Sequence, residues 1–178
     1  CVLWAVDVDD DFHARFSAES RRYRYVLLNR RIRPGLLGGR VGWTHGPLDE
    51  EAMRSAAACL VGEHDFTSFR AAECQAKSPV RCMHSVEVRR QGDIVLFDFH
   101  ANAFLHHMIR NLVGSLVFVG KGRKPAEWMA ELLAVRNRTL AAPTFAPDGL
   151  YLCGVEYPAR WPLPGGGRII AAPQLLLP

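Results

Sequence analysis

The 178-residue sequence lacks several of the features that define specialised classes of protein. No apolar run approaches the roughly 20 residues of a transmembrane helix, so we expect no membrane span. The five cysteines are scattered and form no CxxC pair, which excludes the usual spacing of a structural zinc site and favours reduced cysteines in a cytoplasmic protein. Lysine is scarce as well, because only three of the 22 basic residues are lysines and the rest are arginines.

What is present is the composition of an ordinary globular protein, with 49% hydrophobic and 22% charged residues. A chain of this length fits one domain, in which folding hides roughly 70% of the surface of the unfolded chain. Proline and glycine become frequent after Tyr157. We therefore predict one domain over residues 1–157 and an extended tail over residues 158–178, within which Ile169–Ile170 and Leu175–Leu177 can dock on the domain.

The arginines are concentrated in the first quarter of the chain. Eight of them fall between Arg15 and Arg40, and Glu19 is the only acidic residue in this window. The planar guanidinium group stacks on bases and grips phosphates, so this concentration favours nucleic-acid binding. A solvated basic surface is the alternative. The predicted RNA-binding residues, one of them outside the window, are Arg15, Arg21, Arg22, Arg24, Arg30, Arg31, Arg33 and Arg70.

The stretch Ala101–Leu116 predicts a helix with two different faces. Apolar residues recur at three- and four-residue spacing, as in a helix packed on a core. A second face carries polar or small residues at positions i, i+3, i+4 and i+7, namely His107, Arg110, Asn111 and Gly114. The adjacent His106 and His107 would point about 100° apart on a helix, so we predict no metal site here. The polar face is either solvated or in contact with a partner outside the helix.

The segment Arg21–Asn29 is the clearest strand in the sequence. Its residues alternate, so Tyr23 and Tyr25 share one face and the neighbouring arginines share the other. Tyrosine rings between arginines are suited to stacking on RNA bases. The alternative is that the tyrosines fill a core, which we prefer for Tyr25.

Other patterns predict the remaining elements. They are a strand over Val2–Val8, a loop over Arg30–Pro47, a helix capped by Asp49 and ended by Gly62, a hairpin of Cys82–Arg90 and Ile94–Phe99, a short helix after Pro125 and a strand over Gly149–Tyr157. This order predicts an α+β fold of the ferredoxin-like, RRM-like split βαβ type, an antiparallel sheet with helices on one face. RRM domains bind RNA on the other face, but their aromatic signature is missing.

Four stretches of the sequence carry a family pattern. They are DFHARFSAESRRYRY (11–25), LVGEHDFTSFRAAEC (60–74), ANAFLHHMIRNLVGSL (101–116) and APDGLYL (146–152). Together they resemble the tRNA pseudouridine synthase A family. Such enzymes isomerise uridines at positions 38 to 40 of the tRNA anticodon stem-loop to pseudouridine, without a metal or an organic cofactor, and act as homodimers. The resemblance implies the same reaction here, on one half of a pseudouridine synthase fold.

The resemblance also implies roles for particular residues. Tyr23 matches the tyrosine that stacks on the base, Arg110 the arginine that pairs with the catalytic aspartate, and Leu150 the aliphatic residue nearby. His107 and Asn111 share the predicted helix face of Arg110 and are expected to contact the substrate as well. We predict that Tyr23, Arg110 and Leu150 converge on one cleft.

The catalytic aspartate of the family is missing from the sequence. The family carries it in a G-R-T-D-A-G-V-H stretch, and no aspartate here has comparable surroundings. Since the chain begins with Cys1, we expect a C-terminal portion of a longer enzyme that is inactive by itself. The alternative is a non-catalytic RNA-binding or assembly module of the same fold, which an upstream G-R-T-D-A-G segment in the gene would exclude. A ferredoxin-like enzyme for a small molecule would leave the arginines unexplained.

Neutralising part of the arginine window is expected to weaken RNA binding. Replacing Arg30, Arg31 and Arg33 by glutamine removes three cations that can bind phosphates. The magnitude of the negative slope of log association constant against log salt concentration should therefore decrease by about one unit for each phosphate that is no longer neutralised. Fluorescence anisotropy with an anticodon stem-loop RNA at several salt concentrations measures both affinity and slope. Unchanged values would mean that these arginines are only a solvated surface.

Overall fold

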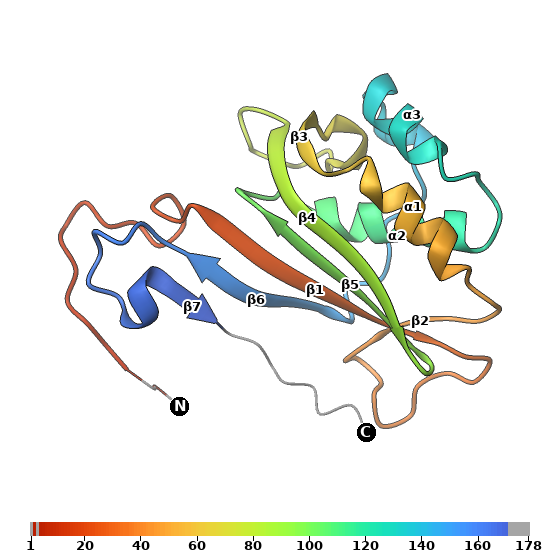
Figure 1. The fold of residues 1–178 in the computed structure, drawn as a ribbon, viewed down its shortest axis with the longest axis horizontal. Coiled ribbons are helices and arrows are strands. Elements are labelled where there is room, and N and C mark those ends of the chain that lie inside the picture. The colour runs from red at the N-terminus through yellow and green to blue at the C-terminus, as the bar shows by residue number, and fades with distance from the viewer. Residues whose placement is uncertain (1, 3, 171–178) are drawn as a thin grey trace.

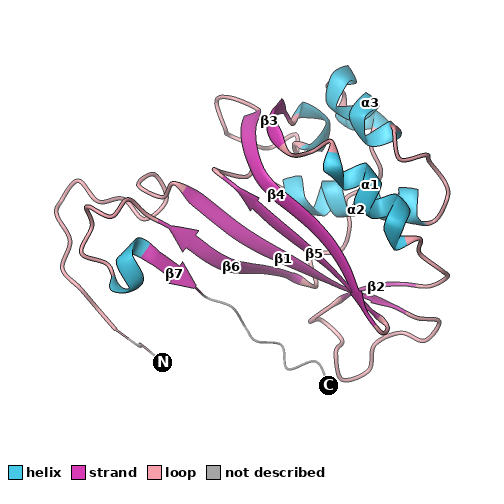
Figure 2. Ribbon diagram, in the orientation of Figure 1, coloured by secondary structure: helices cyan, strands magenta, loops and turns pink. Residues whose placement is uncertain are grey.

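The computed structural model describes residue 2 and residues 4–170, as one sheet with helices packed against one of its faces (Figures 1 and 2). The strands are β1 (Ser20–Asn29), β2 (Gly42–Thr44), β3 (Gly62–Asp65), β4 (Val80–Gln91), β5 (Ile94–Ala101), β6 (Leu150–Glu156) and β7 (Arg168–Ile170). The helices are α1 (Glu50–Ala58), α2 (Met108–Gly120) and α3 (Trp128–Val135), with 3-10 turns at Thr67–Phe69, Arg138–Leu140 and Pro164–Gly167. None of the helices in these residues is long and apolar enough to cross a membrane.

The strand order confirms the predicted fold class. The sheet runs β3-β4-β5-β1-β6-β7, with β2 paired in parallel to the end of β1 and the other pairs antiparallel. Its four central strands are joined by α1, between β1 and β4, and by α2, between β5 and β6. This is the split βαβ arrangement expected from the order of the elements.

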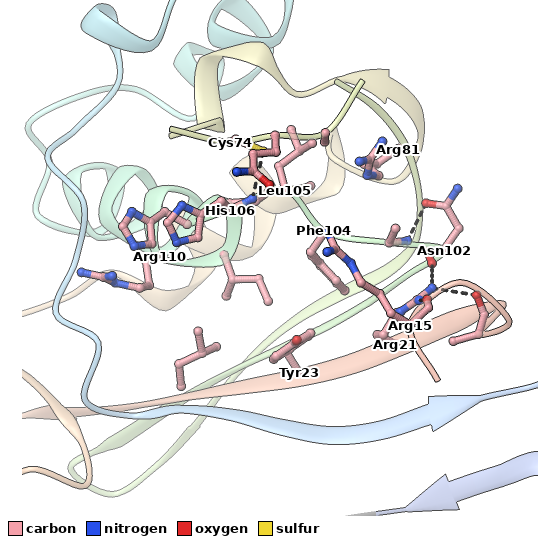
Figure 3. A pocket seen from close by; sticks show the side chains of 18 of the residues that line it. Arg15, Arg21, Tyr23, Cys74, Arg81, Asn102, Phe104, Leu105, His106 and Arg110 are labelled. Atoms are coloured by element: carbon pink, nitrogen blue, oxygen red, sulfur yellow. Dashed lines mark hydrogen bonds between the residues drawn. The ribbon is translucent and has the colours of Figure 1, made fainter. Parts of the chain in front are cut away.

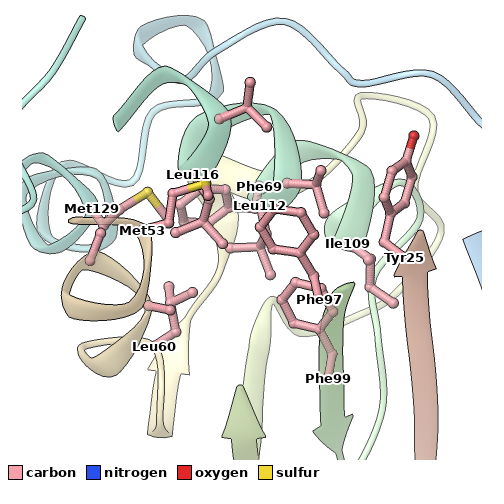
Figure 4. Close-up of a cluster of buried hydrophobic side chains, with 14 of the residues drawn as sticks. Tyr25, Met53, Leu60, Phe69, Phe97, Phe99, Ile109, Leu112, Leu116 and Met129 are labelled. Atoms are coloured by element: carbon pink, nitrogen blue, oxygen red, sulfur yellow. The ribbon is translucent and has the colours of Figure 1, made fainter. Parts of the chain in front are cut away.

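Strand β1 lies at the centre of the sheet and separates two cores. It is hydrogen-bonded to β5 on one side and to β6 on the other. Tyr25 is fully buried in the main core beneath the helices (Figure 4), and Leu27 is buried in the same core. Val26 and Leu28 belong to a smaller cluster on the opposite face. The predicted alternation of β1 and the core position of Tyr25 are confirmed.

Helix α1 begins where its capping residue predicts. The carboxylate of Asp49 accepts a hydrogen bond from the backbone N–H of Ala52 at 2.9 Å, which satisfies one of the unpaired donors of the first turn. The helix ends at Ala58, before Gly62, which opens β3 with a φ of 109°. Its buried Met53 packs against Gly120 at the end of α2, where a Cβ atom would lie 2.7 Å from the sulfur.

Helix α2 starts later than its sequence pattern predicts. The pattern predicts a helix from Ala101, but residues 102–107 form a turn and the helix runs from Met108 to Gly120. The side chain of Asn102 stabilises this turn, because its Oδ1 accepts hydrogen bonds from the N–H groups of Ala103 (2.7 Å) and Cys82 (3.0 Å). His107 then adopts a left-handed conformation, with a φ of 58°, which an α-helix does not continue through.

The ends and connections of the chain also differ from the prediction. In residues 2 and 4–8 there is no strand, because no neighbouring strand pairs with this segment. The predicted loop Arg30–Pro47 contains β2, and the connection after α1 contains β3; both are short strands that form only through pairing with longer neighbours. The described part of the predicted tail is not wholly extended: Ile169–Ile170 docks on the domain, as one part of the prediction allowed, because β7 pairs with β6. Leu175–Leu177 lies outside the described residues.

The polar face of α2 is covered by the chain segment 141–147. Gly114 makes this approach possible, because a Cβ atom at this position would lie only 2.5 Å from the carbonyl oxygen of Pro143. The N–H of Phe145 donates to the carbonyl of Arg110 at 3.2 Å, beyond the same glycine. Where this segment packs, the polar face of α2 is shielded from solvent and is not available to an external partner.

Enlarging Gly114 is expected to destabilise the protein. In Gly114→Ala the new methyl group meets a backbone carbonyl that cannot rotate away, so the free energy of unfolding should fall by about 1–3 kcal/mol, although alanine favours helices. Gly35→Ala is the matched control, since no heavy atom lies within 4 Å of its Cβ position. Urea denaturation compares the two variants. Equal stability of both would mean that segment 141–147 does not press on α2.

Candidate functional site

A cavity in the described residues lies on the helix-bearing side of the sheet, beside the start of α2 (Figure 3). Its volume is about 1030 Å³. Tyr23 reaches it from β1, Arg110 from the first turn of α2, and Leu150 from the start of β6. The predicted convergence of these three residues on one cleft is confirmed, and His107 also lines the cavity.

Tyr23 forms part of the floor of the cavity. It pairs with Phe99 of β5 and Leu152 of β6, which fixes its backbone at the centre of the sheet. Its ring packs edge-on against Phe104, with the centroids 5.1 Å apart and the planes at 81°. Burial raises the pKa of the Tyr23 hydroxyl, so the residue is neutral at physiological pH. A flat, partly buried ring at this position can stack on a planar base.

Arg110 is held at one end and free at the other. Its Nε donates to the carbonyl of Phe145 at 2.8 Å, which orients the guanidinium group. Among the described residues, its two terminal nitrogens have no hydrogen-bond partner and no carboxylate pairs with it. These nitrogens can therefore bind an anionic or carbonyl group of a ligand.

The lining of the cavity is basic. The lining contains two carboxylates, Glu19 and Glu73. It contains five cationic side chains, which are Arg15, Arg21, Lys77, Arg81 and Arg110. Arg21 is held by the carbonyls of Ala18 (2.8 Å), Asn102 (2.7 Å) and Arg15, so no carboxylate neutralises it there. No aspartate is among the residues of the described chain that line the cavity. Such a surface suits a phosphate-bearing ligand.

Several of the lining residues have no counterpart in the prediction from sequence, among them two cations and one aromatic residue. Arg81 stands at the start of β4, Lys77 in the connection before it, and Phe104 in the turn before α2. Only the pairing of β4 with β5, which places Met83 opposite Ala101, brings Arg81 next to this turn. No local pattern in the sequence marks that proximity.

His106 and His107 lie together with Glu73 at the rim of the cavity. The two rings stack with their centroids 4.0 Å apart, and both Nδ1 atoms approach Oε1 of Glu73, at 3.4 and 3.8 Å. The prediction that these histidines point apart is wrong, because both precede α2 and the left-handed backbone of His107 turns its ring onto that of His106. The three side chains could hold a metal ion. Burial, followed by the neighbouring His106 and Arg110, lowers the pKa of His107, so its imidazole is neutral at physiological pH.

Asn111 does not line the cavity, in contrast to its predicted role in substrate contact. It is completely buried. Its amide nitrogen donates to the carbonyl of Phe69 (2.8 Å), and its Oδ1 accepts from Arg138 (3.0 Å) and from the hydroxyl of Thr144 (2.7 Å). These bonds use the polar atoms of Asn111 within the protein, because segment 141–147 packs against the helix face that carries it.

Several of the predicted RNA-binding arginines lie away from the cavity. Arg22 pairs with Glu156 at 3.2 Å and Arg24 with Asp98 at 2.6 Å, both on the opposite face of β1. Arg70 donates to two carbonyl groups of its own connection, at 2.6 and 2.9 Å. Among the predicted set, only Arg15 and Arg21 line the cavity.

The remaining members of the set lie near the end of β1. Arg30 and Arg31 line a smaller cavity of about 520 Å³ together with His45. The guanidinium group of Arg33 lies over the ring of Trp43, 4.6 Å from its centroid. These arginines form a basic surface of their own, separate from the cavity at Tyr23.

Removing the Asn111 side chain is expected to destabilise the fold. In Asn111→Ala, the buried carbonyl of Phe69 loses its partner, as do the half-buried Arg138 and the exposed hydroxyl of Thr144. The free energy of unfolding should therefore fall by at least the roughly 1–3 kcal/mol that one unsatisfied buried group costs. Thr144→Val removes one of the three bonds and should cost only about 0.5–1.5 kcal/mol. Chemical denaturation measures both. A smaller loss for Asn111→Ala than for Thr144→Val would contradict the network.

Comparisons with known proteins agree with the resemblance. The family model described as tRNA pseudouridine synthase matches residues 56–158. The tRNA pseudouridine synthase A of Aromatoleum aromaticum is 67% identical over 174 residues, which cover 98% of this chain and 66% of that protein. The enzymes of the same name from Dechloromonas aromatica and Nitrosomonas eutropha are 61% and 57% identical, over 92% of this chain and 62% and 59% of their own lengths.

The chain thus spans about three fifths to two thirds of the length of these curated relatives. Identity at this level, over nearly the whole chain, leaves no other family to consider. The chain belongs to the tRNA pseudouridine synthase family.

Proposed function

We propose that this chain supplies the base-binding part of the active site of a tRNA pseudouridine synthase. The enzyme isomerises uridines 38–40 of the tRNA anticodon stem-loop. The observation that carries the proposal is the meeting of Tyr23, Arg110 and Leu150 in one basic cavity, although they come from three separate elements. Its volume of about 1030 Å³ leaves room for a nucleotide removed from the stack.

The reaction explains the types of residue in the cavity. The bond between the sugar and the uracil nitrogen must break, the free uracil must turn, and a bond from the sugar to a ring carbon must form. The Tyr23 ring would stack on the uracil, and Leu150 would exclude water from its edge. The terminal nitrogens of Arg110, already oriented by Phe145, would hold an anionic group at the sugar.

The surrounding cations fit the rest of the substrate. Arg15, Arg21 and Arg81 line the same cavity as the base-binding residues, so the phosphates next to the extruded nucleotide would meet positive charge. Their contacts carry no sequence information, which leaves the choice of uridine to the shape of the stem-loop. We propose in addition that the protein acts in the cytoplasm and as a homodimer.

The carboxylate needed at the sugar is not supplied by these residues. Arg110 has no carboxylate partner in the described chain, and the carboxylates of the cavity are glutamates, one of them beside two histidines. We therefore expect the 178-residue chain to bind tRNA but to make no pseudouridine. A non-catalytic RNA-binding module is the second candidate, favoured by the same unpaired Arg110.

Substitutions in the cavity are expected to weaken RNA binding. Tyr23→Ala removes the stacking surface, so the affinity for an anticodon stem-loop should fall by about 1–3 kcal/mol, and Arg110→Gln should lower it as well. Arg22→Gln is the matched control, because this arginine is paired with Glu156 on the opposite face. Anisotropy titrations compare the three variants. If Arg22→Gln weakens binding and the other two do not, RNA uses the other face of the sheet.

Turnover is tested separately with tRNA that carries tritium at position 5 of its uridines. The isolated chain should release no tritium above background. An N-terminal portion that bears the G-R-T-D-A-G motif, added in trans, should restore release if the chain belongs to an enzyme, and should not if it is a non-catalytic module. Release by the chain alone would show that one of its own carboxylates is catalytic.

A further inference from the structure

We propose that Glu73, His106 and His107 form a binding site for a divalent transition metal, with zinc as its preferred ion. The site lies at the rim of the cavity, and its argument does not depend on the proposed reaction. Neither the spacing of the residues in the sequence nor the family resemblance predicts it.

The three side chains already lie at nearly the separations that a bound ion requires. Ligand atoms that are each 2.0–2.1 Å from a tetrahedral zinc ion lie about 3.3–3.4 Å apart. The Nδ1 atoms of His106 and His107 are 3.4 and 3.8 Å from Oε1 of Glu73. All three ligand atoms lie within 4.8 Å of one another, and the two stacked rings would have to turn about their side-chain bonds to direct both Nδ1 lone pairs at one ion.

These polar atoms approach each other without forming hydrogen bonds, and the contacts of Glu73 with the two rings are ion pairs only when the rings are protonated. In the described part of the chain, no hydrogen bond joins the side chains of Glu73, His106 and His107 to each other or to another group. Two stacked imidazoles beside a carboxylate gain little from each other at these distances. An ion between them would use one lone pair of each, which accounts for their convergence.

The backbone fixes the two segments that carry the ligands. The N–H of Ala71 donates to the carbonyl of His106 at 3.1 Å, and the N–H of His106 donates to the sulfur of Cys74 at 3.4 Å. These bonds lie on either side of Glu73 and hold its loop against the histidines. The left-handed backbone of His107 is a conformation that costs energy in a residue other than glycine, and such conformations are concentrated at functional sites.

The donor set determines the kind of ion. Two imidazoles and one carboxylate suit zinc and its first-row neighbours, whereas magnesium and calcium prefer oxygen ligands alone. Glu73 and His106 are exposed, so the fourth position would be open to water or to a phosphate oxygen. Arg110 faces the same cavity, and its positive charge opposes the ion, so we expect reversible binding.

The test is a titration of the full chain with Co²⁺, followed by its visible spectrum, and with Zn²⁺, followed by calorimetry. One equivalent should bind with the spectrum of a tetrahedral site that has nitrogen and oxygen ligands. Glu73→Gln, His106→Asn and His107→Asn should each lower the affinity by more than the about 10–100-fold that loss of an outer-shell partner costs. Asparagine tolerates the left-handed conformation, so His107→Asn keeps the backbone.

The control is His45→Asn, which removes an exposed histidine at the second cavity and should leave the affinity unchanged. Three results would overturn the proposal. They are the absence of stoichiometric binding, full binding in any of the three ligand variants, and thiolate-to-cobalt charge-transfer bands, which would assign the ion to cysteines. Circular dichroism of each variant confirms that it is folded before its result is used.

Discussion

The packing of segment 141–147 across α2 is the contact on which the site depends. It requires Gly114, because any side chain there would meet the carbonyl of Pro143. On one side of this contact Asn111 binds Thr144, and on the other Arg110 binds Phe145. The same segment continues directly to Leu150 at the start of β6. One close approach of two backbones thus sets both the orientation of Arg110 and the position of the aliphatic wall.

The alternation of β1 places its arginines on two faces of the sheet. Arg22 and Arg24 lie on the face away from the cavity, where Glu156 and Asp98 neutralise them. Arg21 lies on the cavity face and is bound only by carbonyl oxygens, so its charge remains available to a ligand. The excess of positive charge in the sequence window is therefore larger than the charge that remains available to a ligand. Positive charge is concentrated at the cavity, because Arg15, Arg21 and Arg81 all line it although Arg81 is distant from the other two in the sequence.

The arrangement of the two histidines at the rim of the cavity results from the late start of α2, at Met108. Residues 102–107 form a turn instead of a helix, so His106 and His107 point together at Glu73. An ion at this rim would place further positive charge beside Arg110, in a cavity that already favours phosphates. Base binding and metal binding would then be neighbouring properties of one surface, each with its own residues.

The sequence by itself determined the elements whose signals are local. The alternation of Arg21–Asn29, the Asp49 cap and the β4–β5 hairpin at Gly92 depend on residues a few positions apart, and each is present in the structure. The family resemblance, together with these elements, was enough to predict that Tyr23, Arg110 and Leu150 lie in one cleft. Only the tertiary structure decided the rest. Strands β2, β3 and β7 exist only through pairing with distant neighbours.

Contacts between distant residues also explain why two predictions about the α2 region, the one for Asn111 and the one for the two histidines, were wrong. Periodicity identified one apolar and one polar face, but it could not tell which chain segment would cover the polar one. Asn111 became a buried support, because Thr144 and Arg138 reach it from about 30 positions away. The two histidines became neighbours of Glu73, because bonds between residues 71–74 and 106 hold them there. Contacts over such separations leave no periodic pattern in a sequence, so only the folded chain shows them.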